Sequence, residues 1–304
     1  MRKQPPIGQA SLFEMERNDS TILTRPATEP PYSDPQLFLG TSAFTANGWV
    51  GSFYPAGMKP EDFLGHYAKT FRTVEIDSTY YGTPAPSTVE SWYRKTPPDF
   101  LFAAKIPQVI THEKMLKDCE AEWEEFLKTI SLLKEKLGPL LLQLPRFSQF
   151  EFKNGSDFLA RFRPFLERLP ERVARNLAIE IRNAPWLDQN LMDCLREHKV
   201  SLALTDTSFL PRPWEQKKPI DFVTADFAYV RWLGNRKQIE TKTTTWDRAI
   251  VDRTDDLRQW VEFLRRIVAE RKLRRLFLFA NNHYQGHGPE TIKLFWQLWK
   301  TVSA

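Results

Sequence analysis

The 304-residue chain has little cysteine, little histidine and no long apolar run. Its two cysteines, Cys119 and Cys194, form neither a metal-ligand nor a redox spacing, so we expect a reducing compartment. The longest apolar stretch, residues 140–144, is far shorter than the roughly 20 residues that span a bilayer. The N-terminal segment contains several acidic residues and has no apolar run of a signal peptide. These absences predict a cytoplasmic protein with no membrane partner.

The charge is moderately positive, with 43 Lys and Arg against 38 Asp and Glu and a net charge of +5. This excess is compatible with an anionic ligand or with nucleic acid. For the basic cluster in residues 265–275 we favour the solvated face of a helix. Aromatic residues make up 13% of the chain, and we expect some of them to line a cleft.

Residues 1–35 differ in composition from the rest of the chain. They contain six prolines, scattered charge and little periodicity, which predicts a flexible N-terminal extension. From there to residue 304, short apolar runs alternate with longer amphipathic segments, which is typical of parallel strands covered by helices. The expected strands are residues 37–42, 73–78, 100–105, 139–144, 177–182, 201–206, 229–233 and 276–281. The expected helices are residues 60–71, 120–137, 156–168, 188–198, 254–271 and 289–302.

Eight strand–helix units predict a single-domain α/β protein with the (β/α)8 TIM-barrel fold over residues 36–304. An open doubly wound sheet is the alternative, but it normally has a Gly-rich first turn that binds phosphate. Here residues 40–44 lead into an aromatic loop instead. We therefore favour the closed barrel.

Polar residues occur at or near the C-terminal ends of the expected strands, where barrel enzymes hold their catalytic groups. The candidate catalytic residues are Glu75, Lys105, His112, Glu180 and Asp206. The candidate substrate-binding residues are Thr41, Ser42, Asp77, Tyr80, Gln143, Arg182, Trp186, Arg231, Asn281 and Asn282. Structural ion pairs inside the barrel are the alternative explanation for the charged members.

Strand alternation sharpens this expectation. Glu180 and Arg182 share one face of their strand, as do Glu75 and Asp77. We expect both pairs to meet Lys105 and Arg231 in one cavity that binds an anion through the guanidinium groups. The loop of residues 234–253 shows little helical pattern and is expected to fold over the mouth, with Trp246 or Arg236 reaching the site.

Two chemical questions remain open at this point. Lys105 could form a Schiff base with a carbonyl substrate or an ion pair with Glu75 or Glu180. No cofactor is predicted and no residue is assigned as a metal ligand. A divalent metal, Mg2+ or Mn2+, is the alternative use of Glu75, Asp77, Glu180 and Asp206.

The sequence resembles the YecE-like family, a domain of unknown function (number 72) with a TIM-barrel fold. The matching stretches are Gly40-Thr-Ser42, Trp49-Val-Gly-Ser-Phe-Tyr-Pro55, Phe71-Arg-Thr-Val-Glu-Ile-Asp-Ser-Thr-Tyr-Tyr81, Phe102-Ala-Ala-Lys105 with Thr111-His112, Gly138-Pro-Leu-Leu-Leu-Gln-Leu-Pro145, Ala178-Ile-Glu-Ile-Arg182 with Trp186, Tyr229-Val-Arg231 and Asn281-Asn282. The resemblance implies the barrel and a polar mouth, and it brings no established reaction. Leu233 and Asn183 stand where the family pattern places histidines, which argues against a mechanism based on either histidine here.

Three functions fit the sequence. The first is an enzyme, a hydrolase or lyase with a weak preference for hydrolysis, acting on a small anionic or polar substrate at the C-terminal mouth. The second is a nucleic-acid-binding protein or nuclease, whose binding would fall steeply with salt. The third is a noncatalytic ligand-binding barrel, which would show a site without turnover. The sequence does not indicate an oligomeric state.

Overall fold

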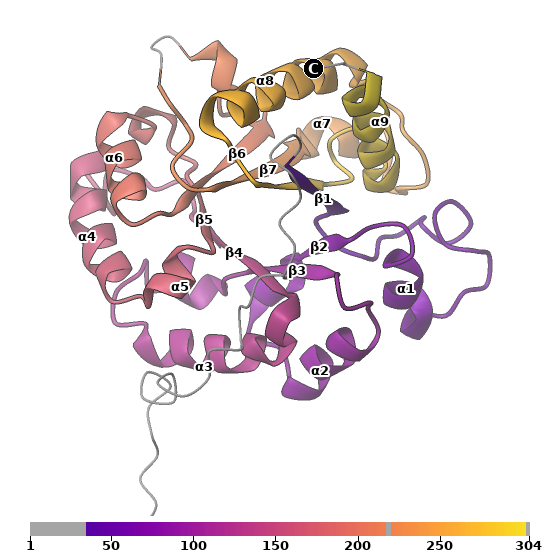
Figure 1. Cartoon of the computed structure of the whole chain (residues 1–304), viewed down its shortest axis with the longest axis horizontal. Coiled ribbons are helices and arrows are strands. Elements are labelled where there is room, and N and C mark those ends of the chain that lie inside the picture. Colours follow the sequence, from indigo (N-terminus) through magenta and orange to yellow (C-terminus); the bar gives the residue numbers. More distant parts are fainter. Residues whose placement is uncertain (1–34, 217–219, 302–304) are drawn as a thin grey trace, which may run out of the picture.

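The computed structural model describes residues 35–216 and 220–301, and nearly all of the predicted N-terminal extension lies outside these residues. Eight parallel strands form one sheet in the order β1-β8-β7-β6-β5-β4-β3-β2, which closes into a nearly complete barrel surrounded by helices (Figure 1). The TIM-barrel prediction is confirmed. The strands are β1 (Gln36–Thr41), β2 (Thr73–Ile76), β3 (Leu101–Lys105), β4 (Leu137–Gln143), β5 (Leu177–Glu180), β6 (Ser201–Thr207), β7 (Phe227–Gly234) and β8 (Arg275–Ala280).

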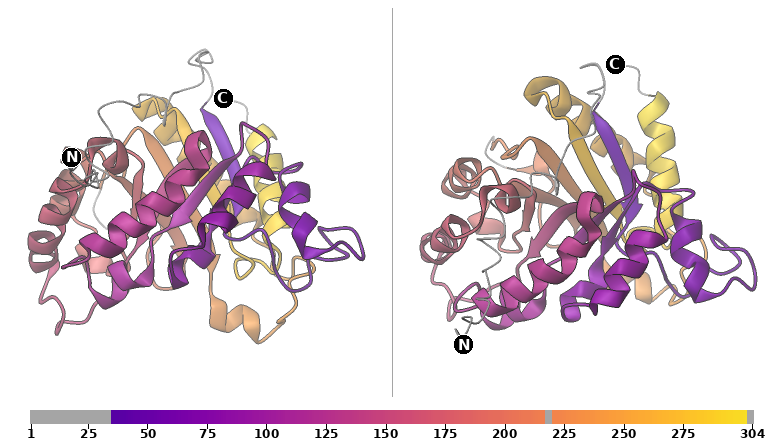
Figure 2. Two further views of the ribbon diagram at one scale, coloured as in Figure 1. Left: turned by 90° about the horizontal axis from the view of Figure 1, so that it is seen from below. Right: turned by 60° about the horizontal axis from the view of Figure 1, so that its bottom comes forward.

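The helices lie outside the barrel, as expected for segments with one apolar stripe (Figure 2). The α-helices are α1 (Pro60–Tyr67), α2 (Pro86–Arg94), α3 (Glu120–Ile130), α4 (Gly155–Glu167), α5 (Glu171–Ala174), α6 (Gln189–Glu197), α7 (Arg236–Glu240), α8 (Thr254–Arg271) and α9 (Gly288–Thr301). Short helical turns are η2 (Asp77–Tyr81), η3 (Val109–Glu113), η4 (Ser131–Lys136), η5 (Ala184–Trp186) and η6 (Pro213–Glu215). No helix in the described ranges is long and apolar enough to cross a membrane.

One predicted helix terminator is wrong. The helix expected over residues 120–137 is α3 followed directly by the helical turn η4, but Gly138 and Pro139 lie inside β4, which begins at Leu137. A side chain at Gly138 would come within 3.1 Å of the Phe102 carbonyl oxygen, so the close strand contact favours glycine. The register between β3 and β4 shifts at this point, which accommodates a proline that has no N–H to donate.

The sheet ends at β1 and β2, and a side chain from α1 bridges these two strands. The Tyr67 hydroxyl accepts a hydrogen bond from the Thr41 backbone N–H at 2.8 Å and donates one to the Thr73 carbonyl at 3.1 Å. A Cβ at Gly40 would lie 2.1 Å from that same Thr73 oxygen, so a side chain there would collide with the β2 backbone. A buried tyrosine therefore joins β1 to β2, and we call this junction the seam of the barrel.

The barrel interior has an apolar layer below a charged layer. The apolar layer consists of Phe38, Ala103, Leu141, Ala178, Ala203, Phe227, Tyr229, Phe277 and Phe279. Small inward residues on β3, β5 and β6 leave room for the large rings of β7 and β8. The same alternation then places long charged side chains at the next inward positions, nearer the C-terminal ends of the strands.

Candidate functional site

The centre of the site is the guanidinium of Arg231, which crosses the barrel from β7. Its Nε and Nη2 donate to Glu75 Oε1 of β2 at 3.1 and 2.7 Å, and its Nη1 donates to Glu180 Oε2 of β5 at 2.5 Å. The Tyr229 hydroxyl donates to the other Glu75 oxygen. The Arg231 side chain is 4% exposed and the two glutamates are fully buried. We call Glu75, Glu180, Tyr229 and Arg231 the buried layer.

A second set of side chains lies above the buried layer and is partly open to solvent. Lys105 Nζ donates to Asp77 Oδ1 at 2.9 Å and lies 4.0 Å from the centre of the Tyr80 ring. The His112 ring meets Tyr80 edge-on, and its Nδ1 is 2.8 Å from the Thr111 hydroxyl. We call Asp77, Tyr80, Lys105, His112 and Arg182 the mouth layer. The ion-pair partner of Lys105 is thus Asp77, whereas Glu75 or Glu180 was predicted.

Local sequence explains why these groups converge. Tyr229 and Arg231 are two residues apart on β7 and therefore point to the same side of the strand. After β2, the chain turns at once into η2, and the Thr79 hydroxyl fastens this turn by donating to the carbonyls of Ile76 and Lys105. This contact holds Asp77 beside the end of β3.

The two buried glutamates have opposite pKa shifts. Complete burial raises the pKa of Glu75, against the opposing charge of Arg231. Burial also acts on Glu180, but Arg231 and Arg182 together overcome it and lower the pKa of that carboxyl. Paired titratable groups whose environments drive their pKa values apart are typical of acid–base sites.

Two groups of the mouth layer have shifted pKa values as well. Burial lowers the pKa of Lys105, although Asp77 opposes the shift. Burial, with the nearby charges of Lys105 and Arg182, lowers the pKa of His112 to about 4. His112 is therefore neutral near pH 7 and can accept or donate a hydrogen bond without carrying charge.

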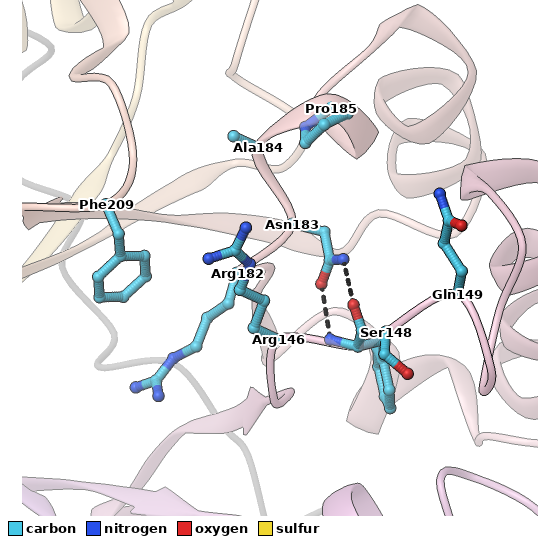
Figure 3. Close-up of a pocket in the computed structure, with 9 residues that line it drawn as sticks. Arg146, Ser148, Gln149, Arg182, Asn183, Ala184, Pro185 and Phe209 are labelled. Atoms are coloured by element: carbon cyan, nitrogen blue, oxygen red, sulfur yellow. Dashed lines mark hydrogen bonds between the residues drawn. The ribbon is translucent and has the colours of Figure 1, made fainter.

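Arg182 connects the network to a cavity. Its Nε donates to Glu180 Oε1 at 2.9 Å, while its side chain is 30% exposed and lines a cavity of about 410 Å3. Figure 3 shows Arg182 and Arg146 between Phe209 and Asn183. Asn183 joins the loops after β4 and β5 by accepting from the Phe147 N–H and donating to the Phe147 carbonyl, both at 2.9 Å. Asn183 thus has a structural task in joining these two loops.

The predicted convergence of Glu75, Lys105, Glu180, Arg182 and Arg231 is present as one hydrogen-bonded and ionic cluster, but Asp206 is not part of it. Thr205 is paired with inward-facing Arg231, so Asp206 points to the outside of the barrel. There its carboxylate accepts from Trp260 Nε1 at 2.7 Å and from the Tyr284 hydroxyl at 3.0 Å. Asp206 therefore connects the sheet to α8 and the loop after β8.

Several other predicted residues make local contacts instead of joining the cluster. Ser42 accepts from Asn281 Nδ2 at 2.9 Å, and Asn282 Oδ1 accepts from the Gly288 N–H at 2.8 Å. Thr41 belongs to the seam described above. Trp186 is buried against Phe147, Phe152 and Phe158. Gln143 is buried beside His112, with 3.4 Å between their Nε2 atoms.

The acidic residues do not fit a divalent metal site. Arg231 occupies oxygens of Glu75 and Glu180, Lys105 is bound to Asp77, and Asp206 lies on the other face of the sheet. Within residues 35–216 and 220–301, no group of three or more His, Cys, Asp or Glu side chains is arranged to hold a metal ion. We therefore derive no step through a metal.

The long loop after β7 contains a short helix, α7, which the sequence did not predict. It extends beyond the strand ends (Figure 2), and its Trp246 N–H donates to the Asn47 carbonyl in the loop after β1. Trp246 packs on His283, with 4.8 Å between ring centroids, and Arg236 pairs with Glu240. The loop lies at the C-terminal ends of the strands as expected, but Trp246 is held by the loops after β1 and β8, and Arg236 is held within α7.

Three residues of the site were missed from the sequence. Tyr229 could have been found, because it precedes Arg231 by two residues and alternation gives both the same face. Arg146 and Phe209 follow β4 and β6 in loops without a motif, so nothing in their spacing indicated a shared cavity. Their proximity comes from barrel closure.

Comparison with known proteins agrees with this architecture. The chain is 26% identical over 252 residues to the UPF0759 protein YecE of Escherichia coli K12, covering 77% of this chain and 84% of that protein. It is similar to the crystal structure of a DUF72 family protein from Thermotoga maritima, with 29% identity, a TM-score of 0.66 and coverage of 87% and 99% of the two chains. A DUF72 family protein from Enterococcus faecalis shares the fold, with 20% identity, a TM-score of 0.63 and coverage of 88% and 98%.

The family comparison covers nearly the whole barrel, from within β1 onward. The model described as "Protein of unknown function DUF72" matches residues 38–304, which include every residue of the buried and mouth layers. This match agrees with the resemblance found in the strand-end motifs. The chain therefore belongs to the DUF72 family.

Proposed function

We propose that the protein is an enzyme that performs acid–base chemistry on a small anionic substrate at the C-terminal mouth of the barrel. The observation that carries the proposal is the Lys105–Asp77 pair, which lies between the buried layer and solvent. The Lys105 side chain is 8% exposed and that of Asp77 is 38% exposed. A substrate at the mouth can therefore reach the amine, while the protein interior controls its basicity.

The supporting electrostatics come from both layers. The lowered pKa of Lys105 makes its amine a better base near neutral pH than a free lysine. Neutral His112 stands beside Tyr80 as a second group that could pass a proton. Arg182 would hold the substrate anion, since its guanidinium is partly exposed and is anchored by Glu180.

Which residue can act as the base bears on the choice between hydrolysis and elimination. Paired carboxylates fit both reactions, but Glu75 and Glu180 are both engaged by Arg231 and buried. A lysine base serves either reaction, by activating water or by removing a proton from carbon. Lys105 is therefore the base in either reaction.

The test is a turnover screen of the purified protein on small phosphate esters and small carboxylates. Lys105→Met should lower turnover by about 100-fold or more, in line with loss of a general base. Lys69→Met, an exposed lysine beyond the end of α1, is the matched control and should retain full activity. Unchanged turnover in Lys105→Met would refute the assignment. Ligand-induced stabilisation without turnover on either class would favour the noncatalytic binding barrel.

A further inference from the structure

The cavity beside Arg182 is positively charged and can bind an anion. It is lined by Arg146, Phe147, Ser148, Gln149, Arg182, Asn183, Ala184, Pro185 and Phe209. This lining contains two arginines and no carboxylate. Its volume of about 410 Å3 falls in the range of small-molecule sites, roughly 300–1,000 Å3.

The two arginines retain unused hydrogen-bonding capacity. Arg146 is exposed and has no ionic partner among the described residues. Arg182 uses its Nε for Glu180, and its two terminal amino groups make no hydrogen bond within the described part of the chain. Two guanidinium groups on one cavity repel each other, so an anion with two negative charges would relieve the repulsion and accept several hydrogen bonds.

The lining also includes an exposed aromatic ring beside Arg182. Phe209 is 46% exposed, and the Arg182 guanidinium lies 5.8 Å from the centre of its ring. Ala184 and Pro185 also line the cavity (Figure 3). A flat aromatic group can stack against such a ring while its substituent reaches the arginines.

The cavity is supported by fixed backbone. The Asn183 amide holds the Phe147 N–H and carbonyl together, and Phe147 itself packs on Trp186 with 5.8 Å between ring centroids. The loops after β4 and β5 are thus bound to each other by the protein's own contacts. A preformed site costs less ordering on binding.

We propose that this cavity binds a small aryl phosphate, with the phosphate between Arg146 and Arg182 and the aromatic ring against Phe209. This inference deepens the proposed function and rests on it for the statement that the ligand is a substrate. Neither arginine alone accounts for the site, because Arg182 is partly neutralised by Glu180 and Arg146 has no such partner. Binding of the phosphate should therefore depend strongly on Arg146.

The test is isothermal titration with phenyl phosphate, cyclohexyl phosphate and inorganic phosphate. Phenyl phosphate should bind wild type about 3- to 10-fold more tightly than cyclohexyl phosphate, the gain expected from ring stacking. Arg146→Ala should weaken phenyl phosphate at least about 10-fold through loss of charge-assisted hydrogen bonds. Arg271→Ala, on α8 and paired with Asp221, is the matched control and should bind like wild type. Equal weakening in both arginine variants, or equal binding of the two esters, would overturn the inference.

Further measurements distinguish a free aryl phosphate from a phosphorylated peptide as the ligand. They also distinguish failure of this inference from failure of the proposed function. Free O-phosphotyrosine and a phosphotyrosyl peptide should bind alike, because the cavity accommodates a small ligand. A peptide that binds tenfold more tightly would overturn the small-ligand assignment. Lys105→Met should retain phenyl phosphate binding. Arg146-dependent binding with no turnover of any substrate would leave this site intact and refute the proposed function. Lys105-dependent turnover of other anions without phenyl phosphate binding would support the proposed function and refute the aryl phosphate site.

Discussion

Two arginines of this barrel each hold carboxylates from two different elements, on opposite faces of the sheet. Inside, Arg231 binds Glu75 and Glu180, and its side chain is 4% exposed. Outside, Arg212 lies 3.2 Å from Asp206 and 2.8 Å from Asp256, and its side chain is 16% exposed. Both clusters consist of an arginine paired with two carboxylates. One lies inside the barrel, and the other lies between the sheet and the outer helices.

The comparison shows that strand alternation decides which charge belongs to the site. Asp206 and Arg231 both occur near the ends of their strands, and each was predicted to lie at the mouth. The register pairs Thr205 with Arg231, so the neighbouring Asp206 faces the helices. A polar residue at a strand end therefore indicates a site only when its parity points inward.

The largest effect is expected from removing the inner arginine. Arg231→Met should lower the free energy of unfolding by about 3–5 kcal/mol, because it leaves the buried Glu75 carboxylate without a cationic partner and Glu180 with Arg182 alone. Chemical denaturation of wild type and variant measures the difference. A loss below about 1 kcal/mol would show that solvent or Lys105 replaces the guanidinium.

A second variant distinguishes the effect of the unpaired charge from the effect of lost packing around Arg231. Adding Glu75→Gln to the Arg231→Met variant removes the buried carboxylate that has lost its cationic partner and should recover part of the stability. The Tyr229 hydroxyl can still donate to the glutamine side-chain oxygen. If the double variant is less stable than Arg231→Met alone, the unpaired charge is not the source of the effect.

The outer arginine should matter less. Arg212→Met should cost about 1–3 kcal/mol, because Asp206 keeps its bonds from Trp260 and Tyr284 and because Asp256 keeps Arg253. Ligand-induced shifts in melting temperature with phenyl phosphate should be the same as in wild type. A lost ligand response in this variant would contradict the separation of the two faces.

Acid should act on the mouth layer through His112. Burial lowers its pKa from the usual value near 6.5 to about 4, so between these pH values the unfolded state binds more protons than the folded state. Stability contributed by the neutral ring is therefore present above pH 6.5 and declines as pH falls toward 4. The loss is below the ~3 kcal/mol that the shift alone implies, because solvent screens the half-buried ring.

Comparison with His112→Gln isolates this contribution. Between pH 7 and pH 4 the melting temperature of wild type should fall more steeply than that of the variant. Above pH 7 the two curves should run parallel. Parallel curves over the whole range would show that His112 titrates alike in the folded and unfolded states.

The smallest effect on stability is expected at Lys105. Lys105→Met should change the free energy of unfolding by less than about 1 kcal/mol, since Asp77 is partly exposed and can be hydrated when its partner is removed. The methionine can retain contact with Tyr80. Calorimetry would detect a larger loss, which would assign Lys105 to the buried layer instead of the mouth.

The sequence by itself determined the fold, the strand positions and most of the inner charge network. Near-continuous apolar strands separated by amphipathic helices require a covered parallel sheet, and two-residue spacing aligns Glu180 with Arg182. These features are local, so they can be read along the chain. They were sufficient to predict the cluster around Arg231.

Only the tertiary structure decided which groups pair and where a ligand could enter. The partner of Lys105 depends on η2, which holds Asp77 beside β3, and the cavity depends on bringing the loops after β4, β5 and β6 together. Such contacts join residues far apart in sequence through barrel closure and strand register. Their positions are set by packing of the whole barrel, so the local pattern around Arg146, Phe209 or Asp206 could not reveal them.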